Sequence, residues 1–92
     1  MDDRKKRLRD IIAAKSLSRG GDFKLASGTT SPYYFNMKPS VMDPDGAQLT
    51  AELILEAVAD IELDCVGGMA LGAVPIVAAV AQASAGSKRP LP

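Results

Sequence analysis

A glycine-rich turn between an apolar segment and an alanine-rich segment most constrains the fold of this chain. Residues 64–69 (Asp-Cys-Val-Gly-Gly-Met) predict a short buried strand that ends in a glycine loop, and residues 73–85 predict a helix of small side chains. Strand, glycine turn and helix form half of a βαβ unit, whose parallel sheet needs another strand after the helix. We therefore expect an α/β fold whose sheet is incomplete within these 92 residues.

The first half of the chain predicts a helix followed by a hairpin. Residues 3–16 have apolar side chains at helical spacing, and Gly20-Gly21 is expected to break the pattern. Residues 23–25 and 33–37 predict two antiparallel strands around the turn-forming residues 27–32.

Asp43-Pro44 marks the start of a further helix. An Asp at the N-cap accepts a bond from an orphan backbone N–H, and Pro at the first helical position loses no hydrogen bond. We expect two units, an N-terminal helix and aromatic hairpin over residues 1–42 and the start of an α/β core over residues 43–92.

Charge is balanced overall but segregated along the chain. Eleven basic residues equal eleven acidic ones, yet eight of the basic residues lie at or before Lys24, and residues 43–64 contain seven acidic residues and no basic one. The simplest interpretation is that solvated helix faces pair with each other or with a neighbouring subunit. We expect no nucleic-acid partner, because the basic cluster lacks interleaved aromatic residues and a known reading module.

The residue inventory excludes several kinds of site. The chain has no His and one Cys, so a disulfide framework, a multi-cysteine zinc site and a Ser-His-Asp triad cannot be written. Cys65 is expected to be buried in the strand. No secretory signal and no apolar run of about 20 residues is present, so we expect a cytoplasmic protein without a membrane span.

Two segments carry the chemistry. All four aromatic residues lie between positions 23 and 35, and Tyr34 and Phe35 point to opposite faces of a strand, so one can pack inward while the other stacks on a planar ligand. The amides near Ser27-Gly28 could meet an anionic substituent. The glycine loop from Gly67 to Ala73 could bring backbone amides and a helix N-terminus to a phosphate. A plain hairpin with core aromatics and a tight packing turn remain the alternatives.

Taken in order, these segments resemble the orotate phosphoribosyltransferases, members of the type I phosphoribosyltransferases. The resemblance rests on four stretches: Phe23-Lys24-Leu25-Ala26-Ser27-Gly28, Ser31-Pro32-Tyr33-Tyr34-Phe35-Asn36, Asp43-Pro44-Asp45-Gly46, and Gly67-Gly68 through Gly72-Ala73-Val74-Pro75-Ile76. It implies a type I phosphoribosyltransferase-like α/β fold in which an N-terminal helix and hairpin hood precede the first strand, loop and helix of the parallel sheet.

The resemblance also implies an activity. The family is a glycosyltransferase class that joins orotate to phosphoribosyl pyrophosphate in pyrimidine (UMP) biosynthesis, releasing pyrophosphate and forming orotidine 5'-monophosphate. It uses magnesium, bound mainly through phosphoribosyl pyrophosphate, and its members are homodimers. The family's catalytic loop and ribose-phosphate motif would follow residue 92, so no catalytic residue is assigned here and the 92-residue chain alone is expected to be inactive.

Site residues follow from the same resemblance. Orotate contacts are expected at the hairpin: Tyr34, Phe35, Ser27 and Gly28. Backbone contacts to pyrophosphate are expected at the loop: Gly68, Leu71, Gly72 and Ala73. Lys24 is expected as a further contact to a phosphate, and no side chain is assigned to a metal. The chain departs from some relatives at Ala26, where they carry Lys, and at Leu71-Gly72, where they carry Tyr-Lys.

Two alternative functions stay open. One is a phosphoribosyltransferase that acts on a purine or on uracil, and the other is a non-enzymatic binding module with a basic docking helix.

Overall fold

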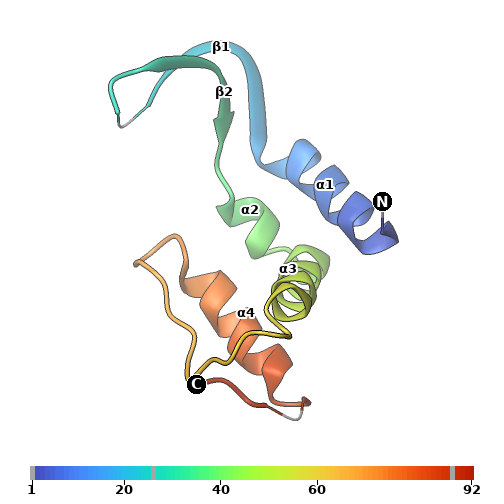
Figure 1. Cartoon of the computed structure of the whole chain (residues 1–92). Helices are drawn as coiled ribbons and strands as arrows, with labels where there is room; N and C mark the ends of the chain where they lie inside the picture. Colours follow the sequence, from blue (N-terminus) through green and yellow to red (C-terminus); the bar gives the residue numbers. More distant parts are fainter. Residues whose placement is uncertain (1, 26, 88) are drawn as a thin grey trace.

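The computed structural model describes residues 2–25, 27–87 and 89–92. Along the chain, the elements are α1 (Asp3–Lys15), β1 (Leu17–Lys24), β2 (Thr30–Phe35), α2 (Lys38–Val41), α3 (Pro44–Ala57) and α4 (Val74–Ser84). The hairpin of β1 and β2 projects away from the helices, and α4 packs beside α3 at the other end of the molecule (Figure 1). None of the described helices is long and apolar enough to cross a membrane.

The predicted hairpin forms, but both strands begin earlier than expected, and residues 30–32, which were predicted as turn, belong to β2. The strands pair antiparallel, with Leu17 opposite Phe35 and Lys24 opposite Thr30. The register shifts between Arg19 and Phe23, where β1 has more residues than its partner. Gly20 lies there with a φ of 79°, a conformation that glycine adopts without steric cost. The helical pattern has already ended at Lys15, and the expected break at Gly20-Gly21 is a bulge inside β1.

A buried junction joins the hairpin to the helices. The hydroxyls of Ser16, at the end of α1, and Ser40, in α2, are 2.5 Å apart and buried. The Ser16 carbonyl also accepts a bond of 2.9 Å from the amide of Asn36, which follows β2. Both ends of the hairpin are thus tied to one point, so the junction sets the direction in which the hairpin projects.

The predicted helix start at Asp43-Pro44 lies next to this junction and is confirmed. The Asp43 carboxylate accepts a bond of 2.9 Å from the Gly46 amide and also pairs with the Lys15 ammonium at 2.9 Å. Gly46 is buried with its Cα against the Ser40 carbonyl, where a side chain would overlap that oxygen. Cap, ion pair and close approach therefore hold α1, α2 and α3 together.

The small apolar core lies mainly between α3 and α4. Its buried side chains come from both helices, from α2 and from the C-terminal tail: Val41, Leu49, Ala51, Val80 and Leu91. The tail is attached by hydrogen bonds, since the Leu91 amide donates to the Ser84 hydroxyl at 2.8 Å. The helix predicted over residues 73–85 is confirmed as α4, and its small side chains allow the close approach of α3.

The strand predicted over residues 64–69 does not form. The segment is irregular, and the described part of the chain has one sheet, the two-stranded hairpin. A strand is stabilised by pairing along its length. Here the described segment has one backbone bond to the C-terminal tail, from the Val66 amide to the Pro92 carbonyl at 2.9 Å, and one turn bond, from the Ala73 amide to the Met69 carbonyl at 3.2 Å. The expected burial of Cys65 is wrong for the same reason: its thiol is free and exposed.

Replacing Gly46 tests the close approach at the junction. Gly46→Ala should lower the free energy of unfolding by about 1–3 kcal/mol, because the methyl group would overlap the Ser40 carbonyl and force α2 and α3 apart. Gly86→Ala is the matched control, since no atom lies within 4 Å of a side chain there. Chemical denaturation measures both, and equal stability of the two variants would contradict the packing described.

The charge on Asp43 should make stability fall in acid. The Gly46 amide bond, followed by the Lys15 ammonium, lowers the pKa of Asp43 below its ordinary value of 3.8. The resulting stabilisation is fully present above pH 3.8 and is lost as the pH falls through the lower native pKa. Asp43→Asn keeps an N-cap acceptor but cannot titrate, so its stability relative to wild type should rise below pH 3.8. Thermal unfolding from pH 6 to about pH 2.5 measures the difference, and parallel profiles would exclude this role.

Candidate functional site

The predicted site residues fall into two groups that the described chain keeps apart. The hairpin carries Lys24, Ser27, Gly28, Tyr34 and Phe35, and the loop before α4 carries Gly68, Leu71, Gly72 and Ala73. Among the described elements, neither strand of the hairpin contacts α4, and α2 and α3 lie between the two groups (Figure 1). Each group is therefore a separate half-site in this chain.

The aromatic rings occupy both faces of the hairpin. The Tyr34 ring stacks on Phe23, with ring centroids 5.8 Å apart and planes inclined by 28°. Phe35 points to the opposite face, where it lines a groove with Leu8 and Leu17. The expectation that one ring enters the core is wrong, because Tyr34 and Phe35 are 45% and 55% exposed. A single planar ligand can therefore stack on one of the two rings but not on both.

The hairpin turn uses one of its predicted amide donors internally. The Gly28 amide donates to the Leu25 carbonyl at 2.9 Å, and Gly28 has a φ of 89°, which favours glycine. Lys24 and Ser27 are exposed on either side of the turn start, so an ammonium and a hydroxyl are accessible there. Ala26, where the sequence was expected to depart from the family pattern, lies outside the described residues.

The loop before α4 has open backbone amides next to a helix N-terminus. The Ala73 amide donates to the Met69 carbonyl at 3.2 Å, which closes the turn, and the Ala70–Leu71 peptide is cis. Within the described chain, the amides of Leu71 and Gly72 have no hydrogen-bond partner. Leu71 is 79% exposed, so this turn faces solvent. Unpaired amides at the positive end of a helix dipole favour an anion.

Gly68 has a packing role in the same loop. A side chain at this position would lie 2.7 Å from the Ala73 Cβ and 3.0 Å from a methyl group of Val77. Gly68 thus lets the incoming chain approach the first turn of α4, whereas no atom lies within 4 Å of a side chain at Gly72. Gly68 is therefore needed for close packing against α4, whereas Gly72 leaves the backbone of the loop accessible to solvent.

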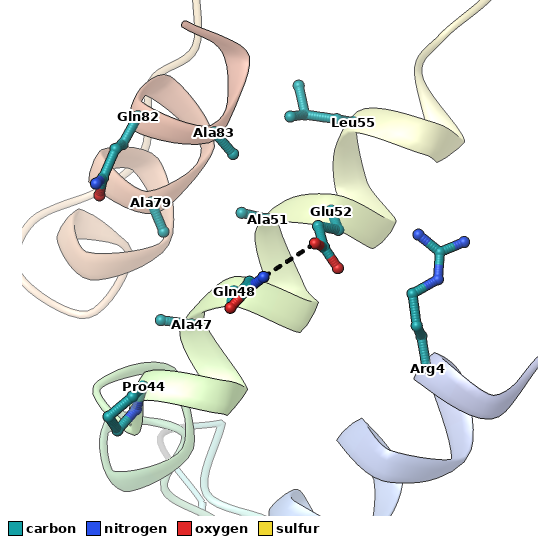
Figure 2. Close-up of a pocket in the computed structure, with 10 residues that line it drawn as sticks. All are labelled: Arg4, Pro44, Ala47, Gln48, Ala51, Glu52, Leu55, Ala79, Gln82 and Ala83. Carbon is teal, nitrogen blue, oxygen red and sulfur yellow. Dashed lines mark hydrogen bonds between the residues drawn. The ribbon is translucent and has the colours of Figure 1, made fainter. Parts of the chain in front are cut away.

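A cavity of about 670 Å³ lies between α3 and α4, beside the start of α1. Figure 2 shows Ala47 and Ala51 of α3 facing Ala79 and Ala83 of α4, with the Gln48 amide donating to the Glu52 carboxylate at 3.2 Å. None of the predicted site residues lines this cavity. The described residues also contain no group of three His, Cys, Asp or Glu side chains that could hold a metal ion.

Sequence comparison finds relatives that all carry the same protein name. The chain is 51% identical over 78 residues to the orotate phosphoribosyltransferase of Rhodopseudomonas palustris (strain BisB18), covering 85% of this chain and 41% of that protein. It is 35% identical over 78 residues to the orotate phosphoribosyltransferase of Methanocorpusculum labreanum. The chain is a homologue of part of orotate phosphoribosyltransferase. The predicted resemblance is confirmed, and the chain spans about 41% of the length of the first of these relatives. No protein-family model matches the chain.

Solved structures confirm the expected fold class. Orotate phosphoribosyltransferase of Mycobacterium tuberculosis H37Rv, in complex with Fe(III) dicitrate, superposes with a TM-score of 0.77 at 28% identity, covering 98% of this chain and 51% of that one. A phosphoribosyltransferase from Corynebacterium diphtheriae gives a TM-score of 0.78 at 22% identity, which supports the fold alone. The helices and hairpin are therefore part of a type I phosphoribosyltransferase-like domain.

Phe23 was not predicted as a site residue, although its ring covers Tyr34. The sequence pattern places Phe23 on a strand, where its direct cross-strand partner is Ser31. Its ring nevertheless lies over Tyr34, because the bulge at Gly20-Gly21 shifts the register of the two strands. The concentration of aromatic residues was the one available signal.

Removing the Phe23 ring should free Tyr34. Phe23→Leu should abolish the ring-current shift of the Tyr34 ring protons and reduce the free energy of unfolding by about 0.5–1.5 kcal/mol, because the stacked pair is lost. Phe35→Leu is the control, since that ring lies on the other face of the hairpin. Proton NMR measures the shifts, and an unchanged Tyr34 spectrum in Phe23→Leu would contradict the stacking.

Proposed function

We propose that this chain forms part of an orotate phosphoribosyltransferase, which transfers the phosphoribosyl group of phosphoribosyl pyrophosphate to orotate. The 51% identity over 78 residues to a relative of that name carries the proposal. In the reaction, the bond between C1 of the ribose and the diphosphate oxygen breaks, and a bond from C1 to a ring nitrogen of orotate forms. Holding the two reactants in line supplies much of the rate in a transfer of this kind.

The hairpin is proposed to hold orotate. Tyr34, stacked on Phe23, offers a flat and accessible ring surface for a planar base, and Ser27 lies at the turn with its hydroxyl exposed to the same ligand. Lys24, exposed at the start of the turn, is proposed to contact a phosphate. Phe35 lies on the side of the hairpin that faces α1. We therefore assign it to the packing between the hairpin and α1, and not to the Tyr34 surface that is proposed to hold orotate. Gly28 contributes the shape of the turn.

The loop before α4 is proposed to bind the diphosphate. The open amides of Leu71 and Gly72 can donate to phosphate oxygens, while Gly68 and Ala73 hold the loop against the helix. Magnesium is proposed to bind mainly through the diphosphate of phosphoribosyl pyrophosphate, which offers the oxygen ligands that this cation prefers. A homodimer in the cytoplasm is part of the same proposal.

A chimeric enzyme tests this function. The matching 78-residue segment of the Rhodopseudomonas palustris (strain BisB18) enzyme is replaced by that of this chain. The chimera should form orotidine 5'-monophosphate from orotate and phosphoribosyl pyrophosphate with magnesium, and no product from uracil, hypoxanthine or guanine. A folded chimera that prefers uracil or a purine would favour the other phosphoribosyltransferases, and one without any turnover would contradict the proposal. The 92-residue chain alone should give no product.

The same chimera tests the assignment of the aromatic rings. Tyr34→Ala should lower kcat/KM for orotate roughly tenfold, because a base stacked on an aromatic ring is stabilised by an amount of that order. Tyr33→Ala is the matched control, since Tyr33 lies on the opposite face of β2. Equal losses in both variants would show that Tyr34 does not contact the base.

A further inference from the structure

The two glycines of the bulge in β1 have different surroundings. Gly20 has a φ of 79°, and no atom lies within 4 Å of a side chain placed there. Gly21 has no positive φ, but a Cβ at this position would lie 3.1 Å from Cζ and 3.3 Å from Cε2 of the Phe23 ring. Gly20 therefore shapes the backbone of the bulge, whereas Gly21 leaves the space that the Phe23 ring occupies.

The Phe23 ring has two neighbours inside the hairpin. Its far end lies over Gly21, and the ring stacks on Tyr34 with centroids 5.8 Å apart. Phe23 is half-buried, whereas the other three aromatic side chains of the chain are exposed. Gly21, Phe23 and Tyr34 thus form a small cluster within the hairpin.

The helices do not hold Tyr34 in place. Among the described elements, the backbone of β2 lies close to β1 alone, and the turn end of the hairpin projects away from the helices (Figure 1). Phe35 is the ring that faces α1, and Tyr34 lies on the opposite face of β2. Among the described residues, Phe23 is therefore the ring that fixes the plane of Tyr34.

A ring held in this way suits the recognition of a planar ligand. Phe23 covers one face of Tyr34, which is 45% exposed, so the opposite face is available to a base. A free aromatic side chain gives up rotamer freedom when a ligand orders it, and that cost lowers affinity. In the stacked pair this ordering takes place during folding, so Tyr34 presents a preorganised surface.

We propose that Phe23 and Gly21 are positioning residues for orotate, which act through Tyr34. Phe23 fixes the plane of the Tyr34 ring on which the base stacks, and Gly21 leaves the room that Phe23 needs. Neither residue contacts the base. The inference rests on the proposed function, because it concerns the orotate-binding side chain assigned there.

Loss of the Phe23 ring provides the first test, in the chimera with the Rhodopseudomonas palustris enzyme. Phe23→Leu should raise the KM for orotate roughly threefold or more, because part of the stacking on Tyr34 is lost, and should leave the KM for phosphoribosyl pyrophosphate unchanged. A variant that is only less stable contains less folded enzyme, which lowers the apparent kcat without changing either KM. Tyr33→Leu is the matched control, because it removes an aromatic ring from the other face of the same strand.

A double-mutant cycle shows whether Phe23 acts through Tyr34. In a chimera that carries Tyr34→Ala, Phe23→Leu should not raise the KM for orotate further, since the ring that it positions is absent. An undiminished rise in that background would overturn the inference, as would an unchanged KM for orotate in Phe23→Leu or an equal rise in the control. A folded chimera without turnover contradicts the proposed function instead, so the two failures are distinguishable.

The part of Gly21 is tested on the 92-residue chain itself, where no turnover is needed. Gly21→Val should displace the Phe23 ring and remove the ring-current shift of the Tyr34 ring protons in proton NMR, because the new methyl groups need the space of that ring. The signals of α3 and α4 should stay in place, since neither helix lies close to the hairpin. Asp22→Ala, at an exposed neighbour in the same bulge, is the control and should keep the shift. An unchanged Tyr34 spectrum in Gly21→Val would overturn the inference.

Discussion

The buried hydroxyl pair of Ser16 and Ser40 is the interaction on which the arrangement of this chain depends. It joins the end of α1 to α2 at the point where both ends of the hairpin return, and Asp43 then caps α3 directly beside it. Buried hydroxyls without a partner are costly, so the pair favours one relative placement of helices and hairpin. Gly46 completes the junction because a side chain there would overlap the Ser40 carbonyl.

The two halves of the proposed substrate site depend on this junction in different ways. The aromatic hairpin is carried by it, whereas the glycine loop is carried by α4, which packs on α3 through small side chains (Figure 2). A transfer between orotate and a diphosphate ester needs both halves at fixed distance. Changes at the helix packing should therefore affect turnover even where they contact no substrate.

Several features were predictable because local chemistry decides them. Asp43-Pro44 favours a helix start, since capping and the fixed φ of proline are local effects that tertiary contacts need not supply. The hairpin and α4 were also predicted from local chemistry, the hairpin from its turn-forming residues and α4 from the run of small side chains after the glycine loop. The strand over residues 64–69 was wrong because strand formation depends on a partner that local pattern does not provide. Burial of Cys65 followed from that strand and was wrong with it.

The residues alone predict the order of helix, hairpin, capped helix and glycine loop, together with the family resemblance that the motifs carry. The division of the aromatic rings is visible only in the folded chain, where Tyr34 stacks on Phe23 and Phe35 turns towards α1. This division follows from the bulge at Gly20-Gly21, because the bulge shifts the register between the strands. Local propensity specifies that a segment forms a strand, but the pairing between β1 and β2 decides that the Phe23 ring lies over Tyr34.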